Sequence, residues 1–270
     1  MRPVWRRYGT NPARLTSSLM PDPTFFLVAA LAVFMVGLSK SGLVASLGVV
    51  GVPLLTLVMP ARDAAGMMLP LLIVMDIIAL FAYRREVNWR IFLILLPGAL
   101  VGTVIAFSLS AVVSEAMVRL AIGIITLLFV LDAWLPLRKK LEGLPPSRIW
   151  GTFWGSVAGF TSFVSHTGGP PIQIYMLPLR LTPALFAGTN AVFFAVVNAI
   201  KIPPYLVLGQ LSWANMQTAV YLVPVAIAGM LLGVFLVRRI DPAIFYRVAY
   251  VLIFLLSLKL IYDGIVGIWG

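Results

Sequence analysis

The sequence predicts an all-α polytopic membrane protein, and three observations lead to that prediction. Of the 270 residues, 61% are hydrophobic and only 11% are charged, whereas a soluble domain is nearer half apolar and a quarter charged. Several apolar runs reach about 20 residues, the length of a helix that crosses a hydrocarbon layer of roughly 30 Å. Two breaks rich in glycine and proline then stand at matching places in the two halves of the chain.

The predicted membrane spans are eight long apolar runs. In chain order they cover residues 24–45, 64–83, 91–109, 116–136, 150–165, 184–208, 216–237 and 243–262. Two further apolar stretches, 46–60 and 167–179, are short and are interrupted by glycine and proline. Proline removes a backbone donor and glycine permits close approach of the backbone, so we expect broken or re-entrant elements there. Irregular backbone survives at membrane depth only where protein or a water-filled cavity satisfies it.

The two broken stretches occupy corresponding places, which predicts an internal repeat. Gly51-Val52-Pro53 aligns with Gly169-Pro170-Pro171. We expect a polar amino-terminal segment at 1–23, a first transmembrane repeat at 24–137, a cytoplasmic linker at 138–149 and a second transmembrane repeat at 150–264. With about four spans in each half the repeat is parallel. If the short stretches also cross, each half has five spans and the repeat is inverted. The distribution of arginines favours eight crossings over ten.

The net charge of +11 comes largely from basic residues between the apolar runs. They are Arg2, Arg6, Arg7 and Arg14 before the first span, Arg84, Arg85 and Arg90 after the second, and Arg138, Lys139, Lys140 and Arg148 in the middle linker. No basic face interleaved with aromatic side chains is present, so we expect no nucleic-acid partner. The positive-inside rule places these three segments in the cytoplasm, and we expect the lipid bilayer of the bacterial inner membrane around the spans. The absence of cysteine excludes disulfides and thiolate chemistry.

Both broken elements have a distinctive local sequence. The first reads Gly37-Leu38-Ser39-Lys40-Ser41-Gly42 and then Gly48-Val49-Val50-Gly51-Val52-Pro53, and the second reads Gly159 and then Thr167-Gly168-Gly169-Pro170-Pro171. These elements resemble those of the TauE/SafE sulfite exporter family, over about residues 24–264. The resemblance implies a secondary carrier of small sulfur oxyanions or organosulfonates, with both elements near the substrate path. The first element is less glycine-rich than the family's usual run, and His166 stands where we expect a small residue.

Lys40 is the first candidate for a substrate-binding residue. It lies late in the first span, between Ser39 and Ser41 and beside a glycine-rich break. A charged group in the apolar layer costs roughly 2.5–3.5 kcal/mol on insertion scales, so each one is a functional candidate. The ammonium would neutralise an oxyanion while both hydroxyls donate hydrogen bonds. The alternative is that the span ends earlier and Lys40 extends to the membrane surface.

His166 is the single histidine and stands between Ser165 and Thr167 in the second broken element. Its unperturbed pKa of about 6.5 would let it take up and release a proton as the site alternates between the two sides of the membrane. We therefore expect roles in substrate binding and in proton coupling. A structural hydrogen-bonding role is the alternative. A zinc site is not expected, because it needs about three protein ligands.

The glycines of the two breaks are candidates for backbone contacts to the substrate. Gly48, Gly51, Gly168 and Gly169 would let N–H groups face a ligand, and helices that start after the prolines would direct positive dipole ends at an anion. Interrupted helices in corresponding positions of two halves indicate a transporter site. Gln173 adds a polar side chain to the second element. Tight packing of helices is the competing role of these glycines.

A third group of polar residues lies in other spans. Asn190 and Asn198 are eight residues apart and project within about 80° of each other on one helical face, with Lys201 nearby. Asp76 occupies the place in the first half that corresponds to Asn198. Because an acid within a span is costly, Asp76 is predicted to relay a proton or to pair with Lys40. Hydrogen bonding between helices is the competing role.

Together these features predict a proton- or gradient-coupled secondary transporter of small sulfur-containing anions that works by alternating access. No nucleotide-binding motif indicates a primary pump. A membrane-embedded enzyme would have few candidate catalytic side chains, because there is one histidine and no pair of catalytic carboxylates. We therefore expect neither an enzyme nor a cofactor. An anion channel or a scaffold remains an alternative. A homodimer is compatible with the sequence.

Overall fold

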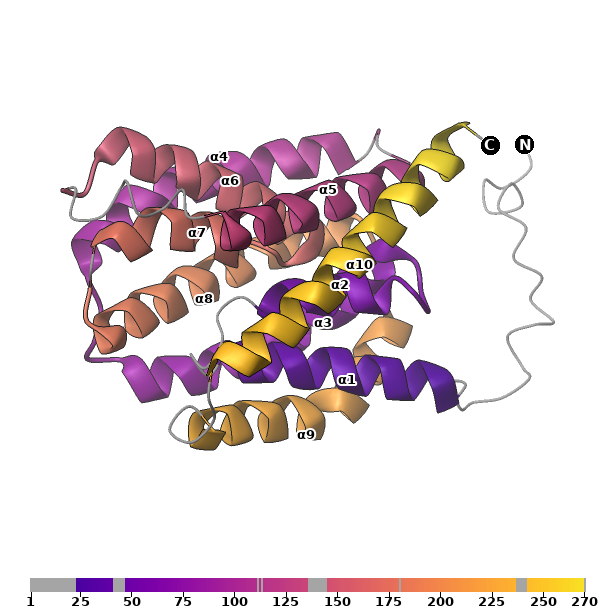
Figure 1. The fold of residues 1–270 in the computed structure, drawn as a ribbon, viewed down its shortest axis with the longest axis horizontal. Helices are drawn as coiled ribbons and strands as arrows, with labels where there is room; N and C mark the ends of the chain where they lie inside the picture. Colours follow the sequence, from indigo (N-terminus) through magenta and orange to yellow (C-terminus); the bar gives the residue numbers. More distant parts are fainter. Residues whose placement is uncertain are drawn as a thin grey trace.

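The computed structural model describes residues 23–40, 47–110, 112, 114–135, 145–179, 181–236 and 242–269. All regular structure in these ranges is helical, and most of the long helices run along the long axis of the molecule (Figure 1). Five of the described helices, α1, α3, α4, α8 and α9, are long and apolar enough to cross a membrane. The predicted class, an all-α membrane protein, is confirmed.

The long helices of the described residues correspond to the eight predicted spans. They are α1 (Pro23–Lys40), α3 (Ala61–Tyr83), α4 (Trp89–Ser110), α5 (Glu115–Trp134), α6 (Arg148–Ser165), α8 (Pro183–Val207), α9 (Trp213–Leu236) and α10 (Pro242–Trp269). Several begin at hydroxyl caps. The Oγ atoms of Ser114 and Ser147 and Oγ1 of Thr182 each accept a hydrogen bond from the backbone N–H three residues later, which satisfies one orphan donor of the first turn.

The two broken stretches form short helices that fold back along the preceding long helix. After α1 come the 3₁₀-helix η3 (Leu47–Val50) and α2 (Gly51–Leu55). A Cβ atom on Gly48 would lie 3.1 Å from Ser39 Oγ, and one on Gly51 would overlap Val36. Residues later in the chain therefore meet residues earlier in α1, so this segment runs antiparallel to α1. We call α1, η3 and α2 hairpin 1.

The second break repeats this arrangement. After α6 come α7 (Gly169–Met176) and the 3₁₀-helix η5 (Leu177–Leu179). Gly168 lies against Ser162 near the end of α6, and Tyr175 Oη donates a hydrogen bond to the carbonyl of Ser147 before the start of α6, at 3.0 Å. α7 therefore runs back along α6. We call α6, α7 and η5 hairpin 2.

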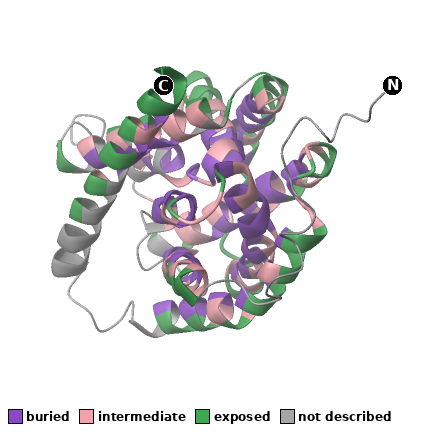
Figure 2. Cartoon of the chain, turned by 90° about the vertical axis from the view of Figure 1, so that its right-hand side faces the viewer, coloured by how far each residue is buried: buried purple, intermediate pink, exposed green. Residues whose placement is uncertain are grey.

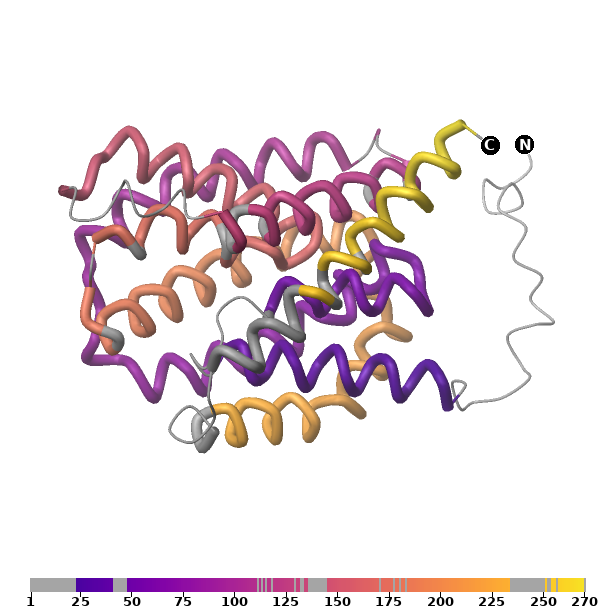
Figure 3. Tube along the Cα trace, viewed as in Figure 1, coloured from indigo at the N-terminus to yellow at the C-terminus, as the bar shows by residue number. Residues whose placement is uncertain are grey.

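The directions of the helices follow from their contacts. Helix α3 runs antiparallel to α8, because Asp76 meets Asn198 while the carbonyl of Tyr83 meets Gly188. Helices α5 and α10 also run antiparallel (Figure 3). Helices that hold the same place in the two halves therefore run in opposite directions.

Helices α4 and α6 run parallel with their backbones in contact. Gly98 approaches the carbonyl of Thr152, and Gly102 approaches the carbonyl of Ser156 one turn later. Any Cβ atom at either glycine would overlap that carbonyl oxygen, so these positions require glycine. The α4–α6 pair and the α1–α9 pair join the two halves, because each contains the hairpin helix of one half and a long helix of the other.

These directions match the inverted alternative and not the parallel one that the arginines favoured. Each short helix runs back along the long helix before it, and the number of membrane crossings stays a prediction. The 84–88 turn, the start of α6 and the end of α9 lie at one end of the bundle, and Pro23 lies at the other (Figure 1). The chain therefore enters α1 at the end opposite to Arg84 and Arg85. The duplication itself stays a prediction, and the amino-terminal arginines lie outside the described residues.

Burial is concentrated along the axis of the bundle, and exposed residues cover its outside (Figure 2). Helix α3 is central, since it packs against α1, α2, α8 and α9 and buries Met67, Met68, Leu71 and Met75. Large apolar side chains face outward, with Leu93 62% and Val104 61% exposed on α4. In a membrane protein such side chains contact lipid and not water.

Candidate functional site

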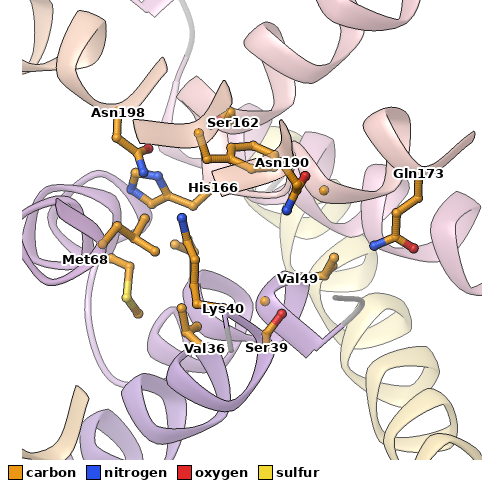
Figure 4. Close-up of a pocket in the computed structure, with 15 residues that line it drawn as sticks. Val36, Ser39, Lys40, Val49, Met68, Ser162, His166, Gln173, Asn190 and Asn198 are labelled. Atoms are coloured by element: carbon orange, nitrogen blue, oxygen red, sulfur yellow. The ribbon is translucent and has the colours of Figure 1, made fainter. Parts of the chain in front are cut away.

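The inner ends of the two hairpins approach the α3–α8 pair and enclose a cavity of about 60 Å³ (Figure 4). The cavity is lined by Val36, Ser39, Lys40, Gly48, Val49, Val52, Met68, Leu72, Ser162, His166, Gly169, Gln173, Asn190, Phe194 and Asn198. A water molecule takes about 30 Å³ in the liquid, so the cavity has room for an ion of a few heavy atoms. Both hairpins contribute to one space with polar groups on several sides.

Lys40 and Asp76 form an ion pair on the wall of this cavity. Lys40 Nζ donates to Asp76 Oδ1, and Asn198 Nδ2 donates to Asp76 Oδ2 at 2.5 Å. Asp76 is only 2% exposed, so its carboxylate depends on these two donors. Lys40 Nζ also lies 5.2 Å from the centroid of the Phe194 ring, within the range of a cation–π contact. The last residue of α1 is thereby held against the middle of α3.

Lys201 is a second cation beside the cavity, and it is fully buried. Its Nζ donates to the carbonyl oxygen and to Oγ of Ser162, each at 3.0 Å, and to His166 Nδ1 at 2.7 Å. His166 Nε2 lies 2.9 Å from the carbonyl oxygen of Ala65. A carbonyl can only accept, so Nε2 carries the ring proton and Nδ1 accepts from Lys201. All three ammonium hydrogens therefore point at neutral acceptors.

The charges around the cavity do not cancel. With both lysines protonated, Lys40 and Lys201 contribute two positive charges and Asp76 contributes one negative charge, with His166 neutral in this hydrogen-bond arrangement. In the part of the chain that the structure describes, no carboxylate forms an ion pair with Lys201. A buried charge is costly unless it is paired. One net positive charge beside a cavity with several polar groups is the arrangement that a small anion would complete.

Comparison with known protein families identifies the family of the chain. The model of the TauE/SafE sulfite exporter family matches residues 29–260, nearly the whole chain. The chain belongs to the TauE/SafE family. Comparisons with curated proteins and with solved structures return no match. TauE/SafE proteins are membrane transporters, so the chain is a multi-pass protein of the cell membrane.

In this TauE/SafE chain, eight of the residues predicted to bind substrate line the cavity. They are Ser39, Lys40, Gly48, His166, Gly169, Gln173, Asn190 and Asn198. Gln173 stands out, because its side chain is more than nine-tenths buried and its Nε2 has no hydrogen-bond partner. Its amide group points toward the cavity in Figure 4. An unpaired donor in a buried position is costly, so this group is available to a ligand.

Four other predicted residues do not line the cavity. Ser165 Oγ and Thr167 Oγ1 lie 2.7 Å apart and bond to each other and to the carbonyl of Thr161, so they hold the turn between α6 and α7. Gly51 lies against Val36 and Met68, and Gly168 against Ala158, Ser162 and Phe194. In the structure both glycines pack against neighbouring side chains and helices, which is the alternative to ligand binding expected from the sequence. Ser41 lies outside the described residues.

His166 combines two structural roles. Its backbone has φ 55° and ψ 24°, a left-handed conformation that ends α6, and its N–H donates to the carbonyl of Ser162 at 3.1 Å. Residues other than glycine rarely adopt this conformation. The turn directs the imidazole across the bundle to Ala65 of α3 and Lys201 of α8. A small residue would satisfy the turn but would leave Lys201 without one acceptor.

Lys201 and Ser162 are the residues that the predicted substrate-binding set lacks. Lys201 is one helical turn beyond Asn198 on the same face of α8, and Ser162 is one turn before His166. A lysine at that position in an apolar span was a usable signal, since ionisable residues in spans are functional candidates. The sequence groups Lys201 with Asn190 and Asn198 but does not connect it with either glycine-rich break.

Proposed function

We propose that the protein is a secondary carrier of a small sulfur oxyanion such as sulfite, or of a short organosulfonate, with the cavity between the hairpins as its substrate site. The observation that carries the proposal is the fully buried Lys201, which forms no ion pair with a carboxylate among the described residues and donates to Ser162 and His166, two residues that line the cavity of about 60 Å³. Membership of the TauE/SafE family supports the substrate class.

The donors around the cavity suit an oxyanion. Oxygen atoms of the anion accept from Lys40 Nζ, Gln173 Nε2 and the amide of Asn190, and the net positive charge compensates the charge of the substrate. The apolar lining from Val36, Met68 and other residues excludes water and strengthens these interactions. Charge-assisted hydrogen bonds are about twice as strong as neutral ones, so a few donors suffice.

The placement of the hairpins supports alternating access as the mechanism. Hairpin 1 enters the bundle from one end and hairpin 2 from the other, and both contact the α3–α8 pair. Movement of one hairpin relative to that pair would open the cavity toward one side while the other hairpin keeps the opposite side closed. Such motion of broken elements around a fixed central site is the usual mechanism of transporters with repeated halves.

Transport of radiolabelled sulfite into proteoliposomes tests the proposal. We expect saturable uptake that Lys201→Met lowers at least tenfold, because the substrate loses an uncompensated positive charge. Lys259→Met is the matched control, since Lys259 lies on α10, is exposed and pairs only with Asp263 in the described part. Uptake that rises linearly with sulfite concentration would indicate a channel. Equal activity of Lys201→Met and wild type would contradict the proposed site.

A further inference from the structure

A second polar site lies between α4 and α6 on the outside of the bundle. A groove of about 360 Å³ is lined by Arg90, Leu93, Ile94, Pro97, Arg148 and Thr152. The α4 residues recur at the spacing of one helical face, and the two α6 residues stand one turn apart. Arg90 and Arg148 both lie near the start of their helices, at the end of the bundle that holds the 84–88 turn. None of these residues lines the central cavity.

The groove faces outward. Leu93 is 62% exposed, and Arg90, Pro97, Arg148 and Thr152 are exposed as well. The neighbouring Trp150 and Phe153 are also exposed on α6. Aromatic side chains beside arginines mark the level at which a membrane protein meets lipid headgroups. The end of the groove that holds Arg90 and Arg148 therefore lies at the depth of the lipid headgroups. The apolar side of the groove continues from there toward the acyl chains.

The floor of the groove is rigid. Gly98 brings the backbone of α4 against the carbonyl of Thr152, and Thr152 Oγ1 donates to the carbonyl of Ile94 at 3.3 Å. The start of α6 is held by the hydrogen bond from Tyr175 Oη to the carbonyl of Ser147. The two arginines thus project from helices whose relative position is fixed, so the site needs little reorganisation to receive a ligand.

The polar groups of the groove are complementary to a phosphodiester. Within the described ranges, neither Arg90 nor Arg148 forms an ion pair with a carboxylate. Guanidinium groups bind phosphate oxygens through two parallel hydrogen bonds. Pro97 has no N–H, so the carbonyl of Leu93 lacks its usual helical donor and can accept from a headgroup hydroxyl. We propose that this groove binds the headgroup of an anionic phospholipid, with its phosphate between the two arginines and an acyl chain along the exposed face of α4.

A lipid fits this surface better than free phosphate does. Free phosphate would use the arginines alone, whereas the exposed apolar face formed by Leu93, Leu100 and Val104 continues from the groove along α4. Basic pockets between transmembrane helices on the cytoplasmic side are a known type of site for anionic headgroups. Because a lipid in the groove would contact both α4 and α6, it would stabilise the interface between the two halves.

Native mass spectrometry of the full-length protein released from nanodiscs tests the proposal, with phosphatidylglycerol and phosphatidylcholine as probes. We expect retained phosphatidylglycerol on the wild type and at least tenfold weaker retention on the double variant Arg90→Gln, Arg148→Gln, since each arginine near the surface contributes about 1 kcal/mol. The matched control is Arg84→Gln, Arg85→Gln, which removes the same charge at the same end without touching the groove. It should keep the lipid.

Three results would overturn the proposal. Equal loss in both double variants would mean a diffuse attraction of the basic end for anionic lipid. Displacement of phosphatidylglycerol by millimolar inorganic phosphate would mean that the groove recognises the free ion. A dimer that the groove substitutions split, with no lipid retained in the wild type, would mean that a second copy covers the groove. Size-exclusion profiles of all variants must match the wild type, and a thermal shift with phosphatidylglycerol confirms binding to folded protein.

Discussion

Lys201 is a cation with no exposed surface, and the groups that accept its hydrogen bonds are neutral. Asp76 is buried as deeply, but it is paired with Lys40 and bonded to Asn198. The two pairs, Lys40–Asp76 and Lys201–His166, therefore have different effects on a ligand. The first is neutral and fixes the end of α1, while the second carries the charge that an anion can balance.

Two substitutions at the Lys40–Asp76 ion pair test whether positive charge at the cavity favours sulfite binding. Lys40→Met removes a positive charge and should weaken sulfite binding at least tenfold. Asp76→Asn removes the negative charge, leaves an amide for the contact with Asn198, and should strengthen binding or leave it unchanged. Binding of radiolabelled sulfite to purified protein gives both affinities. Weaker binding in both variants, with monodisperse protein, would mean that the pair matters for structure and not for charge.

His166 can be tested through the pH dependence of uptake. His166→Gln keeps a group that can accept from Lys201 and donate to the carbonyl of Ala65, whereas His166→Ala removes both contacts. If the imidazole carries the coupled proton, both variants should flatten the dependence of uptake on pH. Only His166→Ala should lower the thermal stability, because it leaves a buried ammonium short of an acceptor. A full pH response in His166→Gln would exclude proton coupling by this residue.

The sequence predicted most of the residues that line the cavity, because ionisable and amide side chains within apolar spans are rare. It could not assign Ser165 and Thr167, whose hydroxyls turn away from the cavity to hold the end of α6. That choice depends on the left-handed backbone at His166, which the local sequence does not signal. Lys201 meets Ser162 and His166 of the cavity wall only because α8 packs across the end of hairpin 2.

At the scale of elements, the two hairpins create the site by ending inside the bundle. The sequence predicted all eight long helices and both breaks, since apolar length and glycine with proline are local signals. The direction of the short helices was not predictable in the same way. It depends on contacts such as those of Gly48 with Ser39 and of Gly168 with Ser162, which join residues on both sides of a turn.

Glycines of the two hairpins should respond differently to enlargement. Gly51→Val would place a branched side chain against Val36 and Met68, so we expect a loss of about 1–3 kcal/mol in stability from overpacking. Gly169→Val would place it in the wall of the cavity and should block sulfite binding while the protein stays folded. Thermal denaturation and a binding assay on the same samples separate these effects. Equal loss of binding without any change in stability would contradict the packing role of Gly51.

At the scale of the whole molecule, opposite directions of corresponding helices collect the basic turns at one end. The 84–88 turn, the start of α6 and the end of α9 lie together there, so the positive-inside rule predicts that this end is cytoplasmic. The count of apolar runs alone does not reveal these directions of the helices.

Cysteine labelling tests this orientation on a background that contains no native cysteine. Glu86→Cys lies in the turn between α3 and α4, and Ser212→Cys lies in the turn before α9, at the opposite end of the bundle. In intact cells, a membrane-impermeant thiol reagent should label Cys at position 212 and should label position 86 only after the membrane is opened. Labelling of both positions in intact cells would contradict the directions of the helices.

The most direct measurement locates the anion itself. Selenite has the shape and charge of sulfite, and selenium scatters X-rays anomalously, so crystals grown with selenite would reveal the bound ion at one atom. The account predicts an anomalous peak in the cavity between Lys40, Gln173 and Asn190, and loss of that peak in Lys201→Met. A selenite peak elsewhere in the protein, with this cavity empty at saturating selenite, would contradict the proposed site between the hairpins.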